Sequence, residues 1–117
     1  MGCLFCCKEE TEIEEKLIIP EVINAYVKRV LSGNKLLVNY KIKDITYNYY
    51  IILSNIDILP NKNNNAMYYL KDNILNKNIR IENIKYMDYN DILAEVYYEN
   101  ININEKMILN GYAVKSK

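Results

Sequence analysis

The chain has 117 residues, with 15 basic and 15 acidic side chains, a formal net charge of zero and no histidine. This length allows one domain behind a short leader, and the charge balance argues against general binding of nucleic acid through its phosphates. The absence of histidine excludes Ser-His and Cys-His catalysis within the chain.

The first residues, MGCLFCCKEETEIEE, are typical of a lipid-modified N-terminus. Gly2 follows the initiator methionine, as N-myristoylation requires, and three cysteines beside it are acceptors for S-palmitoylation: Cys3, Cys6 and Cys7. Cys6 stands where the myristoylation motif prefers serine or threonine. One myristoyl chain binds a membrane only marginally, and the acidic run after Lys8 cannot supply a polybasic second signal. We therefore expect palmitate on the cysteines to complete the anchor.

This anchor predicts both a domain division and a location. Residues 1–16 are expected to form the acylated anchor with its acidic spacer, and residues 17–117 the folded domain. Because myristoylation is a eukaryotic modification, we expect a peripheral lipoprotein on the cytosolic face of a plasma or internal membrane, in a eukaryotic or eukaryote-infecting organism. The alternative is a zinc site or a redox pair at Cys3 and Cys6. Zinc needs further ligands, however, and a redox pair stands at a strand-to-helix turn inside a fold.

Residues 17 onward change to short segments rich in β-type residues. Strands are predicted at residues 25–31, 36–43, 45–53, 78–87 and 92–99. Gly33-Asn34 predicts a hairpin turn at 32–35, between the first two strands. The segment 55–65, with Pro60 and a run of asparagines, predicts an irregular loop.

Two stretches show helical spacing instead. Residues 66–77 predict a helix with Met67, Leu70, Ile74 and Leu75 on one side. A second helix is expected after the capping residue Asn102 and before Gly111, with these residues toward the core: Ile103, Met107 and Ile108. The order predicts a β-rich α+β fold: a five-stranded OB-fold barrel with two helices, one between strands 3 and 4 and one C-terminal.

Three stretches resemble staphylococcal-nuclease-like (thermonuclease) domains: AYVKRVLSGNKLLVNYK, ITYNYYIILSNID and ILAEVYYENININEKMILNGYA. The last follows the family's L-A-x-V stretch and then its V-N-x-x-L-V-x-x-G-x-A pattern. The resemblance spans about residues 22–115 and implies the same OB barrel. It also implies calcium-assisted hydrolysis of phosphodiesters, whose residues can be compared position by position.

The family's D-G-D-T turn, which helps to hold the metal, corresponds to Ser32-Gly33-Asn34-Lys35. The remaining expected roles are a phosphate-clamping arginine, a metal-binding aspartate, a glutamate proposed as general base and a second arginine. The matching positions are, in that order, Asn48, Leu53, Ile56 and Asp91, with Asp57 one residue from Ile56. We therefore expect a non-catalytic pseudoenzyme without a metal or other cofactor.

The sequence thus predicts a lipid-anchored protein-interaction or scaffold module with an unidentified protein partner. Tyrosine pairs at 49–50, 68–69 and 97–98 favour an interface weakly. One alternative is a single-stranded nucleic-acid-binding OB domain, which requires a basic groove. It is disfavoured because acidic residues elsewhere offset the one conspicuous cationic strip, which consists of Lys28, Arg29, Lys35, Lys41 and Lys43. The same strip could meet anionic lipid headgroups. The other alternative is a residual calcium-dependent nuclease.

Overall fold

The computed structural model describes residues 21–86 and 88–116. The main strands are β2 (Ile23–Ser32), β3 (Lys35–Ile42), β4 (Ile45–Leu53), β6 (Asn78–Tyr86) and β7 (Asp91–Tyr98). The shorter strands are β5 (Ile56–Ile58), β8 (Ile101–Asn102) and β9 (Ala113–Lys115). The helices are α2 (Asn63–Ile74) and α3 (Ile103–Leu109). The division between residues 1–16 and 17–117 stays a prediction, because residues 1–20 lie outside the described ranges.

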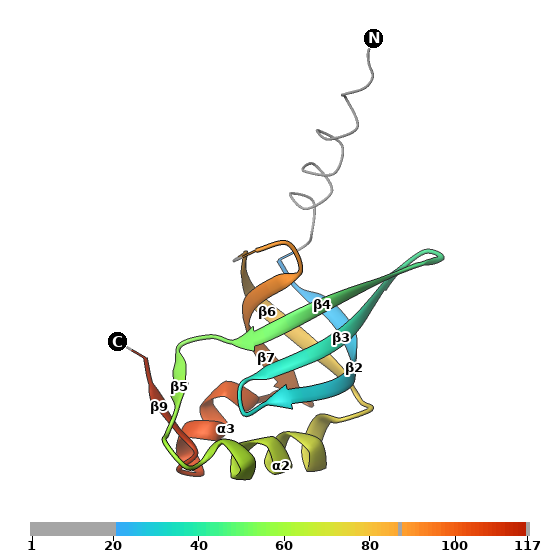
Figure 1. The fold of residues 1–117 in the computed structure, drawn as a ribbon. Coiled ribbons are helices and arrows are strands. Elements are labelled where there is room, and N and C mark those ends of the chain that lie inside the picture. Colours follow the sequence, from blue (N-terminus) through green and yellow to red (C-terminus); the bar gives the residue numbers. More distant parts are fainter. Residues whose placement is uncertain (1–20, 87, 117) are drawn as a thin grey trace.

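The five main strands form a closed barrel (Figure 1). The strand order is β4-β3-β2-β6-β7, and β4 also pairs with β7 in parallel, so that Tyr50 lies beside Asp91 and Leu53 beside Ala94. All other neighbours in the barrel are antiparallel. The prediction of a five-stranded OB barrel, with one helix between the third and fourth barrel strands and one C-terminal helix, is confirmed.

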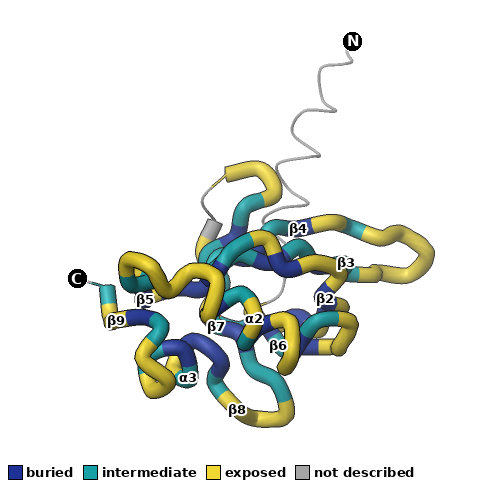
Figure 2. Tube along the Cα trace, turned by 60° about the horizontal axis from the view of Figure 1, so that its bottom comes forward, coloured by how far each residue is buried: buried dark blue, intermediate teal, exposed yellow. Residues whose placement is uncertain are grey.

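The core lies inside the barrel and under the helices. Residues on each strand alternate between inward and outward positions, as the period of two requires, and Figure 2 shows the buried positions as dark segments along the strands. Helix α2 contributes Ala66, Leu70 and Ile74, each fully buried. Helix α3 contributes Ile103 and Met107, whereas Ile108 is only partly buried.

The strand directions assign every loop to one of two ends. One end, here called the helix end, holds turn 33–34, residues 54–55 and both helices. The opposite end, here called the leader end, holds Glu21, where the described chain begins, turn 43–44 and the connection from β6 to β7. Figure 1 shows the tip of the β3–β4 hairpin and the β6–β7 loop on the side of the barrel away from α2 and α3.

Two predictions between β4 and β6 are wrong in detail. The expected loop at 55–65 contains strand β5, which pairs with β9 near the C-terminus, and it also contains the first turn of α2. The helix expected at 66–77 ends at Ile74, because Leu75 is extended and Asn76 has a positive φ of 64°. The amide of Asn76 instead donates to the carbonyl of Val27 at 2.9 Å, which ties the end of the helix to β2.

Three local features agree with the sequence. The expected turn at Gly33-Asn34 joins β2 to β3. The side chain of Asn102 caps α3 by accepting from the amide of Glu105 at 3.1 Å. Gly111 follows that helix with a φ of +82°, a conformation that favours glycine.

Candidate functional site

The turn that matches the family's metal-binding loop is held by its own polar groups. The hydroxyl of Ser32 donates to Oδ1 of Asn34 at 3.0 Å. The amide of Gly33 donates to Oδ1 of Asn63 at 2.7 Å, and a Cβ at this glycine would lie 2.9 Å from both that oxygen and the Cβ of Ala66. The turn therefore packs directly on the start of α2 and requires glycine there.

Of the other expected positions, Asn48 lies apart from this turn, whereas Leu53 lies beside it, because the backbone amide of Leu53 donates to the carbonyl of Asn34 at 2.9 Å. Asn48 is exposed on β4, and its side chain bonds to the side chain of Asn39. It lies four residues from Ile52 on the same strand, a distance of about 13 Å. Ile52 is the residue that pairs with Lys35 beside the turn. Leu53 and Ile56 are both buried in the core, so neither presents a side chain at the surface.

The structure also brings Lys35 and Asp91 together, both beside Tyr50. Lys35 places its Nζ 5.1 Å from the centroid of the Tyr50 ring. Asp91 pairs with the same tyrosine across the parallel β4–β7 ladder. By contrast Asp57, the carboxylate considered as a substitute metal ligand, is exposed on β5 opposite Val114.

These contacts define one outer face of the barrel. Cross-strand partners point to the same side of a sheet, and two rows of partners run side by side here. The first row is Arg29, Leu37, Tyr50 and Asp91, and the second is Lys35, Ile52, Leu93 and Lys85. We call these eight residues the Tyr50 face.

The Tyr50 face is apolar at its centre and charged around its edge. Leu37, Tyr50, Ile52 and Leu93 are each partly exposed, and they lie between three cations and one carboxylate. Within residues 21–86 and 88–116, no group of three or more histidine, cysteine, aspartate or glutamate side chains is placed to hold a metal ion. The arrangement can bury apolar surface and pair with negative charge.

The tyrosine pairs differ in exposure, and only Tyr50 belongs to the Tyr50 face. Tyr49 is buried while Tyr50 faces outward, as expected for neighbours on a strand. On α2, Tyr68 is exposed and Tyr69 packs against the core. The sequence did not indicate that Leu37, Ile52 and Leu93 form one surface, because only the cross-strand register places them together.

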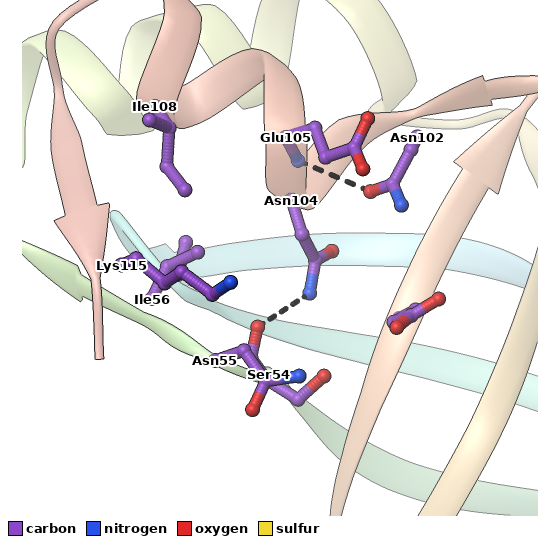
Figure 3. A pocket seen from close by; sticks show the side chains of 9 residues that line it. Ser54, Asn55, Ile56, Asn102, Asn104, Glu105, Ile108 and Lys115 are labelled. Carbon is purple, nitrogen blue, oxygen red and sulfur yellow. Dashed lines mark hydrogen bonds between the residues drawn. The ribbon is translucent and has the colours of Figure 1, made fainter. Parts of the chain in front are cut away.

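Apart from the Tyr50 face, a hollow lies at the helix end, between the β4–β5 turn, β7, α3 and β9 (Figure 3). Its volume is about 360 Å³. The residues that line it are Ser54, Asn55, Ile56, Glu95, Asn102, Asn104, Glu105, Ile108 and Lys115. Its polar groups bond to one another and to residues beside the hollow: Asn104 to Ser54, and Asn102 to Glu105 and Tyr97. The hydroxyl of Tyr97 donates to Glu95 at 3.0 Å, and this hydrogen bond raises the pKa of the tyrosine above its ordinary value.

Asn104 accounts for the polar centre of this hollow. It projects from the start of α3 toward Ser54 (Figure 3) and is only 4% exposed. Its Nδ2 donates to the carbonyls of Ser54 at 2.9 Å and Ala94 at 3.3 Å, and its Oδ1 accepts from the amide of Val96 at 3.1 Å. The asparagine of the I-N-x-x-M-I-x-x-G-x-A pattern thus joins α3 to β7 and to the turn after β4, which is a structural role that spacing alone did not indicate.

The closed barrel, the helix after its third strand and the Asn104 bridge together define an OB-fold domain of the nuclease type. The family model described as staphylococcal nuclease homologue matches residues 51–117, more than half of the chain, and the chain therefore belongs to this family. A search of the curated proteins finds no match. The matched range includes Leu53, Ile56 and Asp91 and begins after turn 33–34.

Replacing Asn104 should destabilise the domain strongly. Asn104→Ala leaves buried backbone groups of Ser54 and Val96 without partners, and we expect it to lower the free energy of unfolding by about 2–4 kcal/mol. Urea unfolding followed by circular dichroism measures this loss, with the exposed Asn65→Ala as control, expected to change it by less than about 0.5 kcal/mol.

A second variant tests the direction of the Asn104 bonds. Asn104→Asp places a carboxylate against the carbonyl oxygens of Ser54 and Ala94 at pH 7, whereas the protonated acid can donate to one of them. Its stability deficit relative to the wild type should shrink as the pH falls from 7 to 4. A deficit independent of pH would contradict this assignment.

Proposed function

We propose that this protein is a non-catalytic, lipid-anchored member of the staphylococcal nuclease family that acts as a protein-interaction or scaffold module on a cytosol-facing membrane. The Tyr50 face carries the proposal. It is an apolar surface on the OB barrel where the resemblance to the family implies groups that bind phosphate and metal.

The chemistry of the expected positions supports a loss of catalysis. Calcium takes six to eight oxygen ligands, several of them carboxylates, whereas the turn offers Ser32, Asn34 and the ammonium of Lys35. Asp91 places a negative charge where an arginine is expected to stabilise the transition state, and such a charge repels the developing phosphorane. Neither Asn48 nor Ile52, the residue in register with Lys35, can clamp a phosphate by charge.

The Tyr50 face has the composition of a protein-binding surface. Interfaces combine an apolar centre with a polar rim and are enriched in tyrosine and arginine. Here Leu37, Ile52 and Leu93 surround Tyr50, with Arg29 on the adjoining strand. The excess of cations over carboxylates favours a partner with negative charge.

The anchor rests on the sequence alone. Gly2, Cys3, Cys6 and Cys7 lie outside the described residues. Over the described ranges, no helix is long and apolar enough to cross a membrane. Acyl chains on glycine and cysteine would supply the two signals that stable membrane attachment needs.

Membrane attachment should depend on Gly2. In eukaryotic cells, full-length protein with a C-terminal fluorescent tag should fractionate with membranes, and Gly2→Ala should be soluble because it cannot be myristoylated. A Cys3/Cys6/Cys7→Ala variant should bind only transiently, because one acyl chain is insufficient. Wild-type protein in the soluble fraction would contradict the anchor and turn attention to the metal content and thiol reactivity of the leader.

Partner binding should depend on the Tyr50 face but not on the anchor. Ile52→Asp places a charge at the centre of this face, so a promiscuous biotin ligase fused at the C-terminus should label fewer specific neighbours on the membrane. The control is Leu109→Asp, which changes a residue 75% exposed on α3. Both variants should still fractionate with membranes and unfold at similar urea concentrations. Equal labelling by both would contradict the assignment of this face.

Nuclease activity should be absent. Purified protein incubated with single-stranded DNA and millimolar Ca²⁺ should leave the substrate intact, while an active calcium-dependent nuclease cleaves it in the same buffer. Cleavage abolished by Asp57→Ala and Asp91→Ala would establish a residual nuclease. Fluorescence anisotropy with a labelled oligonucleotide tests the nucleic-acid alternative, for which Lys28, Lys41 and Lys43 are the exposed cations to replace.

A further inference from the structure

The leader end of the barrel carries a group of exposed apolar side chains. Antiparallel pairing places the start of β2, the end of β3, the start of β4 and the β6–β7 connection at this end. The helices cover only the opposite end (Figure 1). Among the large apolar residues exposed here are Val22, Ile42, Ile45 and Tyr89.

The tip of the β3–β4 hairpin is the most prominent part of this group. Ile42 and Ile45 form the last pair of the ladder, and they are 40% and 56% exposed. Every residue from 41 to 46 is exposed, and Figure 2 shows the tip as one continuous exposed segment. Neither isoleucine belongs to the described core or to the residues packed against it.

Positive charge accompanies these isoleucines. Lys41 and Lys43 lie next to Ile42, with Asp44 as the one acidic residue of the tip. A β-hairpin that presents apolar side chains beside lysines suits the boundary between lipid headgroups and acyl chains, because the lysines reach the phosphates while the apolar groups leave water. Tyr89, 73% exposed in the β6–β7 connection at the same end of the barrel, is of the aromatic type enriched at that boundary.

The place where the described chain begins favours a membrane as the partner of this end. The described chain begins at Glu21 on this same end, so lipids attached near residue 2 would bring this end toward the bilayer. The intervening residues can span up to about 60 Å when extended. Acyl chains alone would therefore leave the domain free to turn, and a second contact is needed to orient it.

We infer that the β3–β4 hairpin tip is a second membrane contact: Ile42 and Ile45 insert among the headgroups, and Lys41 and Lys43 bind anionic phosphates. The inference rests on the proposed lipid anchor. In this orientation the leader end of the barrel faces the membrane, and the Tyr50 face, on the side of the barrel, stays accessible to a partner.

The absence of tryptophan from the chain allows a direct test. Ile45→Trp places a single fluorophore at the tip, and Leu109→Trp places a matched one on α3 at the other end. Full-length myristoylated protein is mixed with vesicles of phosphatidylcholine, with or without phosphatidylserine. Emission of Ile45→Trp should shift to the blue and be quenched by brominated lipids, while emission of Leu109→Trp should not change.

Charge reversal tests the lysines separately. Lys41→Glu/Lys43→Glu should weaken binding by about tenfold on vesicles that contain phosphatidylserine. On vesicles of phosphatidylcholine alone it should have little effect. Equal binding of this variant and the wild type to both kinds of vesicle would overturn the role of the lysines.

The outcomes separate the inference from the anchor. If myristoylated Ile45→Trp protein sediments with vesicles without a blue shift, the anchor stands and the inserted tip is wrong. If it does not sediment even with phosphatidylserine present, the tip supplies no second contact beside the single acyl chain and the inference is wrong. The anchor is judged separately, by the fractionation of Gly2→Ala in cells, where the cysteines can also be acylated. A blue shift in protein that lacks the acyl chain would support the tip contact by itself.

Discussion

The parallel pairing of β4 with β7 is the constraint on which the rest of the structure depends. Without it the five main strands would form an open sheet with two exposed edges, which is a hazard for aggregation. Closure buries the inner side chains of every strand, and it also sets residues of β4 beside residues of β7 that are about forty positions away. The neighbourhood of Tyr50 and Asp91, and with it the whole Tyr50 face, exists only because the barrel closes in this register.

Closure in turn depends on a polar bridge at the helix end. Asn104 satisfies backbone groups of β7 and of the turn after β4, the two strands that close the barrel, and it starts the helix that covers them. A buried side chain with three hydrogen bonds of this kind specifies one arrangement, because any shift of the strands leaves its partners unsatisfied. The family pattern around residues 103–113 therefore marks the joint between barrel and helix, and its presence does not depend on catalysis.

The sequence was sufficient for features that arise from neighbouring residues. Short runs of β-type residues located all five barrel strands, and the capping role of Asn102 and the role of Gly111 follow from residue chemistry alone. It was insufficient where distant pairing decides. Strand β5 spans Ile56–Ile58 and is held by β9, far along the chain, so no local pattern could separate it from a loop.

The candidate site shows the same limit. Sequence order matched Asn48 and Leu53 to family positions, but only the pairing of β3 with β4 shows which residues lie beside turn 33–34. Ile52 pairs with Lys35, and the amide of Leu53 donates to the carbonyl of Asn34.

The zero net charge of the chain conceals a separation of charge that bears on how such a protein could meet a membrane. Residues 1–20 hold two basic and five acidic side chains, which leaves thirteen basic and ten acidic side chains for residues 21–117. An anionic leaflet repels an acidic leader, so the proposed acyl chains would have to overcome that repulsion, whereas the positive excess of the domain is attracted to the leaflet. The acyl chains at one end of the acidic leader and the domain at its other end would then each contact the membrane, while the leader between them is repelled by it. Since two weak contacts joined by a tether bind far more tightly than either alone, this arrangement makes membrane residence sensitive to the removal of either contact.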